Sequence, residues 1–424
     1  MSLEGLALPL VGIVALLVLS ERTLALAFGV LLPLDYIQSV DPFLLDGARY
    51  ALAFAIAVKA WGSPTRMRHA VLARTVLALL LLLGAFLMVS GTITGVASVA
   101  RVGLTGVLSV GAAFLLAVHI DLHRTLVVGF VLGCMISSGD IIAQAVGGPF
   151  LGLATQYGVR YSGFSFKSTA VAPLMAIAIV AVVTPWLWQG KARALRAPFA
   201  IRCAMASVLA VALFLSGGRS GMVALAFAIC VGAAFEAARH PWRAVGVTVV
   251  AFVAAIVFRK ELYQAIVRPD TADLSNGRGE LNATAWAEFL ASPLFGVSPE
   301  TLPLLRPHTP LITFAVEAGV LGLVTAAVLF AIHTRIALGA SPGANFPISM
   351  RMMASVMVVV ALVEPDGFFV GLSKVLLLML VVVQFDHARQ SESTPGEGRA
   401  VDPVVVDRVG LPPDGPLVAC HISF

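Results

Sequence analysis

Residues 71–90 read VLARTVLALLLLLGAFLMVS, a run in which Arg74 is the one charged side chain. An α-helix rises about 1.5 Å per residue, so a run of about 20 apolar residues spans the hydrocarbon core of a bilayer. The apolar residues are continuous and show no alternation with period 2, which argues against a transmembrane β-strand. We therefore expect a membrane-spanning helix over this run.

Similar runs recur along the chain, and the pattern predicts about 12–13 transmembrane helices at roughly 20 residues per span. The other candidate spans are 3–20, 24–38, 44–61, 103–119, 125–146, 168–188, 200–216, 220–236, 244–258, 310–332, 349–364 and 367–385. The first of them lacks a basic start and a small-residue cleavage site, so we expect a retained span rather than a signal peptide.

The composition agrees with a membrane protein. Of the 424 residues, 59% are hydrophobic and 12% are charged, and the mean hydropathy is +0.96. In soluble domains about a quarter of all residues are charged. Because the backbone must satisfy its own hydrogen bonds inside a bilayer, the expected fold class is all-α, polytopic, with one large external loop. The net charge of +5 resides in short loops, and it does not indicate nucleic-acid binding.

The four cysteines predict neither a disulfide framework nor a metal site. Cys134, Cys203 and Cys230 lie inside apolar runs, and Cys420 lies in the polar tail. None of them has the spacing of metal ligands.

Basic residues predict the orientation, because cytoplasmic loops are enriched in Lys and Arg. Basic clusters occur near 59–74, 191–202, 239–243 and 333–335, and an even number of spans separates each from the next. All four are therefore expected in the cytoplasm. The loops expected outside are 91–101, 147–167, 216–221, 259–309 and 364–366.

Four regions follow from this division. Residues 1–258 and 310–385 are expected to form transmembrane helices. Residues 259–309 form the long external loop, in which Leu281, Ala285, Trp286 and Phe289 have helical spacing and predict a short amphipathic helix. Residues 386–424 are rich in Ser, Pro, Gly and charge, and are expected to be a disordered cytoplasmic tail.

The turn Ser216-Gly-Gly-Arg219-Ser-Gly221 separates two apolar runs at the external face. Glycines let backbone N–H groups approach an anion, the following helix offers its positive N-terminus, and an arginine beside them suits a phosphate. A tight turn whose arginine reaches the membrane interface explains the same residues.

Other polar residues near the external face are candidates for chemistry. His308 has an ordinary pKa near neutral pH, which suits a general base, although a structural role at a helix start is the commoner one. Arg160 and Arg278 are candidate cations, and Trp286 is more typical of packing or of an interfacial anchor. Within or beside spans lie further polar groups, for which helix–helix hydrogen bonding is the simpler explanation. These are Asp140, Gln144 and Glu317. Glu364 lies instead in the acidic external turn 364–367, which is a candidate for binding acceptor hydroxyls.

Taken together, these motifs resemble the family of O-antigen ligases and O-antigen polymerases, which are bacterial membrane glycosyltransferases. The resemblance covers roughly residues 155–330. It rests on Arg160-Tyr-Ser-Gly163, the 216–221 turn, Gly277-Arg278, Trp286, Pro293-Leu-Phe-Gly296, His308 and Glu317-Ala-Gly-Val-Leu-Gly322. The family commonly has His-Asn after the loop, where this chain has His308-Thr309, and an Asn after the first arginine, where 166–169 reads FKST.

The resemblance implies a glycan donor on an undecaprenyl-pyrophosphate carrier in the inner membrane. It implies that Arg219 and Arg278, with Arg160 near them, bind the pyrophosphate, and that His308 acts on the acceptor. Trp286, Glu317 and Glu364 are acceptor-side or structural. Neither a cofactor nor a metal is implied. The expected partners are the lipid-linked glycan, membrane lipid and other polysaccharide-assembly proteins.

A transporter or flippase of lipid-linked sugars is the alternative function. Such a protein is expected to show paired broken helices in corresponding halves near the membrane midplane. Here the glycine breaks and arginines gather at one face, which favours surface chemistry. A polysaccharide polymerase is the version of the transferase that we favour, because the departures fall on the acceptor side.

Overall fold

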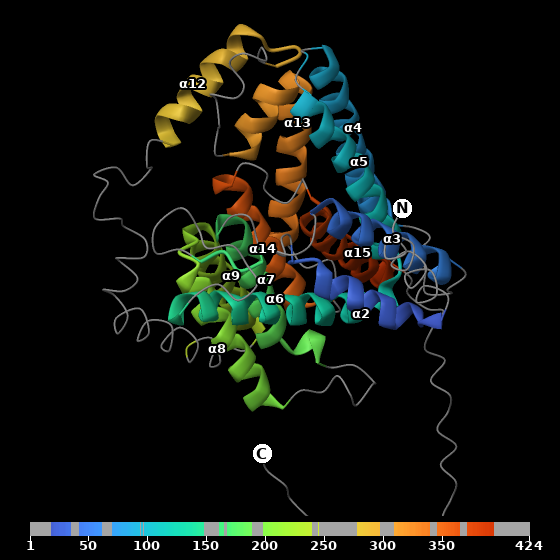
Figure 1. The fold of residues 1–424 in the computed structure, drawn as a ribbon, viewed down its shortest axis with the longest axis vertical. Helices are drawn as coiled ribbons and strands as arrows, with labels where there is room; N and C mark the ends of the chain where they lie inside the picture. The colour runs from blue at the N-terminus through green and yellow to red at the C-terminus, as the bar shows by residue number, and fades with distance from the viewer. Residues whose placement is uncertain are drawn as a thin grey trace, which may run out of the picture.

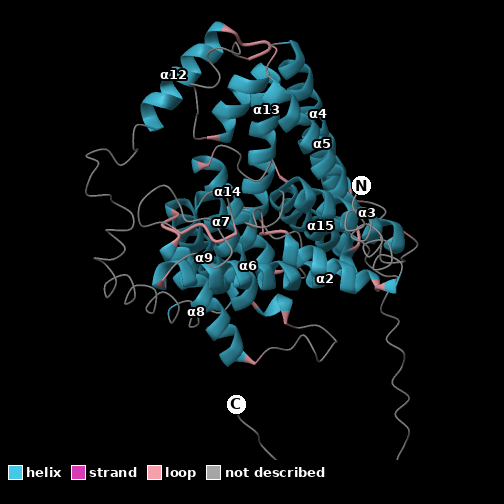
Figure 2. Cartoon of the chain, in the orientation of Figure 1, coloured by secondary structure: helices cyan, strands magenta, loops and turns pink. Residues whose placement is uncertain are grey.

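The structure is a computed structural model that describes residues 18–34, 42–61, 70–147 apart from 94 and 96, 161–164, 168–188, 198–239, 245, 278–296, 309–339, 346–364 and 371–393. Within these ranges the regular elements are helices, with no strand (Figure 2). The α-helices are α2 (Glu21–Leu31), α3 (Pro42–Ala60), α4 (Val71–Ile93), α5 (Ala97–Ala117), α6 (His123–Val146), α7 (Ser168–Val183), α8 (Phe199–Leu215), α9 (Arg219–Arg239), α12 (Arg278–Ala291), α13 (Pro310–Leu338), α14 (Ile348–Val363) and α15 (Leu372–Ser393).

The predicted class is confirmed: the chain is an all-α polytopic membrane protein. Five helices of the described ranges are long and apolar enough to cross a membrane, at Val71–Ile93, Val99–Ala117, Ile120–Val146, Arg219–Ala238 and Pro310–Leu338. Three shorter apolar helices accompany them, at Ala170–Val183, Phe199–Leu215 and Ile348–Val363. Eleven of the predicted spans coincide with described helices, whereas 244–258 and nearly all of 3–20 lie outside the described residues.

Several predicted spans differ in their ends from the helices of the structure, and the two largest differences are at the ends of α2 and α15. The span expected over 24–38 is α2, which ends at Leu31. The last span was expected to end at 385, but α15 continues to Ser393, so the predicted disorder of the tail is wrong for 386–393. This extension keeps packing contacts, because Ala388 is buried and the Asp386 carboxylate accepts a hydrogen bond from the Ala73 N–H at the start of α4, at 2.9 Å. Residues 394–424 lie outside the described residues.

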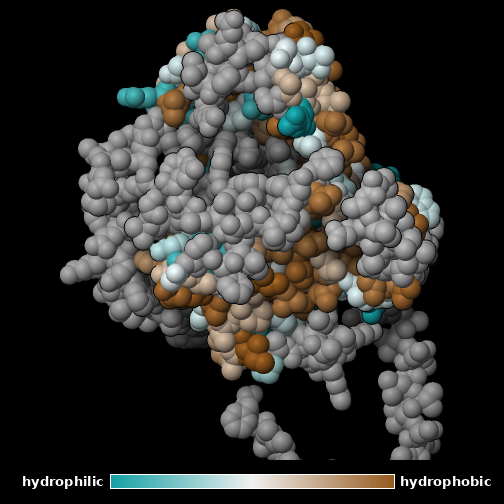
Figure 3. Space-filling model, in the orientation of Figure 1, coloured by the Kyte–Doolittle hydropathy of each residue, from teal (hydrophilic) through white to brown (hydrophobic). Residues whose placement is uncertain are grey.

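Close helix pairs build the bundle (Figure 1). α4 packs on α5, α2 on α6, and α14 lies between α9 and α13. At the α4–α5 contact, a Cβ added to Gly103 would lie 2.5 Å from the Gly84 carbonyl oxygen, so only a glycine permits this approach. In Figure 3 the coloured surface of the bundle is mostly hydrophobic, and hydrophilic atoms lie mostly toward the end that carries α12. Such a surface suits contact with lipid.

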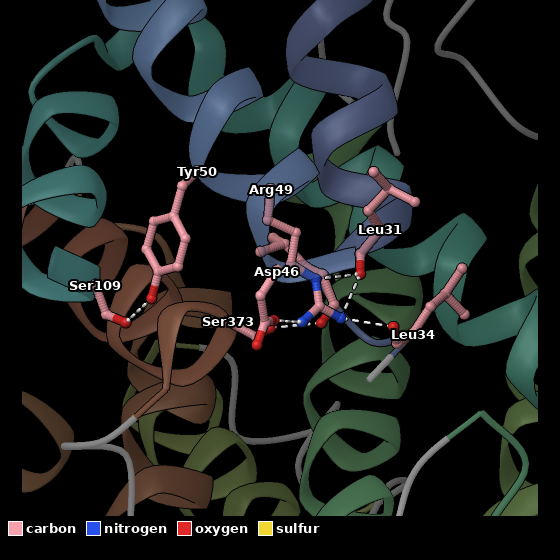
Figure 4. Close-up of polar contacts among 8 residues, drawn as sticks. Leu31, Leu34, Asp46, Arg49, Tyr50, Ser109 and Ser373 are labelled. Carbon is pink, nitrogen blue, oxygen red and sulfur yellow. Dashed lines mark hydrogen bonds and ion pairs between the residues drawn. The ribbon is translucent and has the colours of Figure 1, made fainter. Parts of the chain in front are cut away.

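Two buried arginines complete helix ends inside the bundle. Arg49 of α3 donates to the carbonyl oxygens of Leu31 and Leu34 at the end of α2, at 2.9 and 2.6 Å, and pairs with Asp46 at 2.8 Å (Figure 4). Arg351 of α14 donates to the Gly339 carbonyl oxygen just after α13, at 2.6 Å. The last carbonyls of a helix have no partner within it, and these guanidinium groups supply one.

Candidate active site at the external face

The turn between α8 and α9 is built by its own hydrogen bonds. Gly217 has φ +60°, a conformation that favours glycine. The buried Ser216 hydroxyl donates to the Leu213 carbonyl oxygen at 2.7 Å and accepts from the Gly218 N–H at 3.3 Å. The Gly218 carbonyl oxygen then accepts from the Gly221 N–H at 3.1 Å, which begins α9. The glycines predicted to form a turn therefore do form one, and they place Arg219 in the first turn of a helix.

Arg219 is half-buried, and its Nη2 atom is buried with no hydrogen-bond partner among the described residues. The next residue, Ser220, is 8% exposed, and its hydroxyl has no partner in the same ranges either. A buried donor without a partner is costly, and native structures contain few of them. A guanidinium and a hydroxyl at the positive end of a helix form a site for an anion.

The start of α9 is held firmly against α7. A Cβ added to Gly221 would lie 2.6 Å from the carbonyl carbon and oxygen of Ala172, so the two backbones touch. Ala172 is fully buried. Arg219 therefore projects from a fixed backbone rather than from a long loop.

A second group of motif residues meets at α12 and α13. The helix expected over 281–290 is present as α12, and it packs on the first part of α13. Ala285 and Phe289 are buried there against Ala315 and Val316. Trp286 was grouped with them by its spacing, but its side chain is 39% exposed and its ring lies beside that of Phe289, 5.1 Å between centroids. We name α12 and the turn 293–296 that follows it the cap (Figure 1).

The span predicted over 310–332 is not one continuous helix. Gly319 has φ +62° and ψ −156°, which divides α13 into 310–318 and 320–338. The second piece alone has the length of about 20 residues that a span requires. The turn 293–296 lies at this break, because the Val320 N–H donates to the Pro293 carbonyl oxygen at 2.7 Å. The two motifs that include Gly296 and Gly319 are thus joined in space.

The remaining predicted residues are placed as follows. Glu317 lies at the break, half-buried, and its backbone carbonyl accepts a hydrogen bond from Ser90. Glu364 follows the last residue of α14. Arg278 is the first residue of α12, but its side chain is outside the description. Arg160 and His308 lie outside the described residues.

Two buried polar side chains of α6 form a hydrogen bond with each other. The Gln144 side chain donates to the Asp140 carboxylate at 2.7 Å within that helix, and both are buried. The predicted hydrogen bond between different helices is replaced here by one within a helix.

Sequence reasoning missed Ser90 and gave Ser220 no role. Ser90 is 1% exposed, and its hydroxyl donates to the Phe295 and Glu317 carbonyl oxygens at 2.8 and 2.9 Å. The only signal available was a hydroxyl at the external end of the apolar run 71–90. A neutral side chain with backbone partners far along the chain leaves no pattern in the sequence.

Comparison with known proteins agrees with the motifs. No curated protein matches the chain. Residues 204–327 match the family model described as O-antigen ligase, a segment that runs from α8 through the Arg219 turn, α12 and the break in α13. The resemblance seen in the motifs is thereby confirmed over residues 204–327, which are similar to the O-antigen ligase family.

Proposed function

We propose that this chain is a glycosyltransferase of the cytoplasmic membrane. It transfers a glycan from an undecaprenyl-pyrophosphate donor to a sugar acceptor at the outer face, in the synthesis of a cell-surface polysaccharide. The observation that carries the proposal is the buried Nη2 of Arg219, which has no partner among the described residues at the start of α9. A guanidinium donor of this kind, within the segment similar to O-antigen ligases, supports the binding of a pyrophosphate here.

The chemistry needs two tasks from the protein. The acceptor hydroxyl oxygen attacks the anomeric carbon of the donor sugar, the bond from that carbon to the pyrophosphate oxygen breaks, and undecaprenyl pyrophosphate leaves with the electron pair. Arg219, with Arg278 and Arg160, stabilises the negative charge that develops on the leaving group. The hydroxyl proton passes to His308 acting as a general base. Pyrophosphate is already a good leaving group, so we propose that the reaction requires no nucleotide or metal.

Three features support this assignment of roles. The Arg219 turn is fixed against α7 by the Gly221–Ala172 contact, which suits binding rather than movement. The hydroxyl of Ser220 adds a second donor beside the arginine. Arg278 begins the cap, while His308 precedes α13 by two residues, so both adjoin elements that pack together. Chain polymerisation is the version of the reaction that we favour.

Binding of the donor lipid tests the proposal. The protein is purified into lipid nanodiscs and binds a fluorescent polyprenyl pyrophosphate. Unlabelled undecaprenyl pyrophosphate is then added to compete with the fluorescent ligand, which gives its Kd. We expect Arg219→Ala to raise the Kd about tenfold to a hundredfold, as loss of a charge-assisted hydrogen bond implies. Arg219→Lys should recover part of the affinity, because it keeps the charge but not the planar fork.

Arg101→Ala is the matched control, because Arg101 is an exposed arginine of α5 in the region also expected outside. Its Kd should equal that of the wild type. If Arg219→Ala binds as tightly as the wild type, or if Arg101→Ala loses as much affinity, the pyrophosphate site is not at the start of α9.

A further inference from the structure

The break in α13 leaves backbone groups that the helix itself no longer pairs. In a regular helix the Val320 N–H would donate to the Val316 carbonyl oxygen and the Glu317 carbonyl would accept from residue 321. Here the Val320 N–H donates to the Pro293 carbonyl oxygen at 2.7 Å, and the Glu317 carbonyl accepts from the Ser90 hydroxyl at 2.9 Å. Partners outside α13 therefore compensate the break, as a helix in a membrane requires.

The turn of the cap fits the break closely. Gly296 has φ +86°, and a Cβ added to it would lie 2.2 Å from the Val316 carbonyl oxygen. From the other side, a Cβ added to Gly319 would lie 2.3 Å from the Leu294 carbonyl oxygen. The two backbones are in direct contact, and a side chain at either glycine would separate them.

Ser90 joins this contact to a third element. Its hydroxyl lies 2.8 Å from the Phe295 carbonyl oxygen and 2.9 Å from the Glu317 carbonyl oxygen. These partners are 205 and 227 residues away in the chain. The hydroxyl has one proton, so the two carbonyls share it. Ser90 belongs to α4, which packs beside α13 in the bundle (Figure 1).

We propose that Ser90 is a positioning residue for glycan transfer: its hydroxyl fastens the turn 293–296 to the break in α13 and so fixes the cap over the membrane bundle. We name Ser90, the turn and the break the latch. The proposal rests on the proposed function, because the cap begins at Arg278 and the chain returns from it through His308. With the latch loosened, groups at both ends of the cap lose their fixed place relative to Arg219.

Hydrogen–deuterium exchange of the full-length protein in nanodiscs tests the latch without any activity. In Ser90→Ala we expect peptides covering α12, the turn 293–296 and the break near Val320 to exchange about tenfold faster, as one lost buried hydrogen bond implies. Peptides of α14 should exchange as in the wild type. Ser109→Ala is the matched control. Ser109 lies in the adjacent helix α5, is also 1% exposed, and its hydroxyl lies 2.8 Å from the hydroxyl of Tyr50 in α3. This variant should leave the cap peptides unchanged.

The same variants separate positioning from binding. Ser90→Ala should lower the rate of glycan transfer about tenfold and raise the Kd for undecaprenyl pyrophosphate less than Arg219→Ala does, because Arg219 lies on α9 whereas Arg278 begins the cap. Unchanged exchange of the cap in Ser90→Ala overturns the latch. Faster exchange with a wild-type transfer rate overturns its positioning role.

Two further outcomes are decided by the design. If Ser90→Ala does not accumulate in the membrane, Gly296→Ala replaces it, because a side chain at Gly296 separates the turn from the break. This variant must show the faster exchange of the cap, or the latch is wrong. If the wild type itself transfers no glycan, the proposed function and with it the positioning role fail, while the exchange data still decide whether Ser90 holds the cap.

Discussion

Three arginines show how the surroundings of one residue type decide its role. Arg49 and Arg351 are buried, at 5% and 3% exposure, and their guanidinium groups donate to backbone carbonyls at the ends of α2 and α13. Arg351 also lies over the Phe235 ring, 3.9 Å from its centroid. Arg219 is the contrasting case, because its guanidinium group makes no hydrogen bond to a backbone carbonyl within the described ranges. Arg49 and Arg351 stabilise the fold, whereas Arg219 is available to a ligand.

This contrast predicts that replacing Arg351 destabilises the protein, whereas replacing Arg219 does not. Arg351→Ala removes the donor for the Gly339 carbonyl oxygen and the contact with Phe235, so it should lower the free energy of unfolding by about 2–3 kcal/mol. Arg219→Ala breaks no hydrogen bond with the described residues and should leave the stability near that of the wild type. Thermal unfolding of the two variants in the same detergent measures both. Equal losses in the two variants would mean that Arg219 is a structural residue.

Sequence reasoning identified charged site residues better than neutral ones. Arg219 was found because a charge beside glycines interrupts two apolar runs, and the structure places it at the start of a helix as predicted. Ser90 was missed because its partners are backbone carbonyls more than two hundred residues away, and they are present only after α13 has broken. The roles of Arg160, Arg278 and His308 stay predictions.

Among the elements, the helices were predictable and the break in α13 was not. Apolar length alone predicted α4, α5, α6 and α9. The amphipathic pattern predicted α12, although its buried face is narrower than the pattern suggests, with Ala285 and Phe289 inside and Trp286 outside. The run that forms α13 contains Glu317 and Gly319, but its hydropathy predicts one continuous span and does not mark the break. It depends on the turn 293–296, which arrives from another part of the chain.

The break predicts a sharp difference between two glycines. Gly319→Ala should destabilise the protein by about 3 kcal/mol, because an L-residue rarely adopts φ +62° and its Cβ would lie 2.3 Å from the Leu294 carbonyl oxygen. Gly111→Ala in α5 is the control, since nothing lies within 4 Å of its added Cβ, and it should be neutral or slightly stabilising. Chemical unfolding in mixed micelles measures both. A tolerated Gly319→Ala would argue for a continuous α13.

At the scale of the whole molecule, contacts between helix ends agree with the way the predicted spans alternate between the two sides of the membrane. On the side expected in the cytoplasm, Lys59 donates to the Leu19 carbonyl oxygen at 2.6 Å, Arg202 to that of Val182 at 3.0 Å, and Asp386 accepts from Ala73. On the opposite side, Ser90 meets Phe295. Within each pair, an even number of predicted spans separates the two residues along the chain, so both are expected on the same side of the membrane.

The general fold therefore followed from composition and hydropathy, whereas its precise contacts did not. Spans are set by the length of apolar sequence that a bilayer accommodates, and their orientation by loop charge, both of which are local properties. Contacts such as that between Ser373 of α15 and the Leu32 carbonyl oxygen join distant segments (Figure 4), and no periodicity predicts them.

Glycan transfer in a bacterial host that lacks its own polymerase and ligase tests the proposed activity most directly. The host supplies the lipid-linked glycan, and the wild type is compared with His308→Ala and Arg219→Ala at matched membrane levels. We predict that the wild type lengthens or transfers the glycan and that both variants do not, with His308→Ala retaining the affinity for undecaprenyl pyrophosphate. If the wild type leaves the glycan untransferred while lipid-linked glycan moves from the inner to the outer leaflet, the transferase assignment is contradicted and the flippase alternative takes its place.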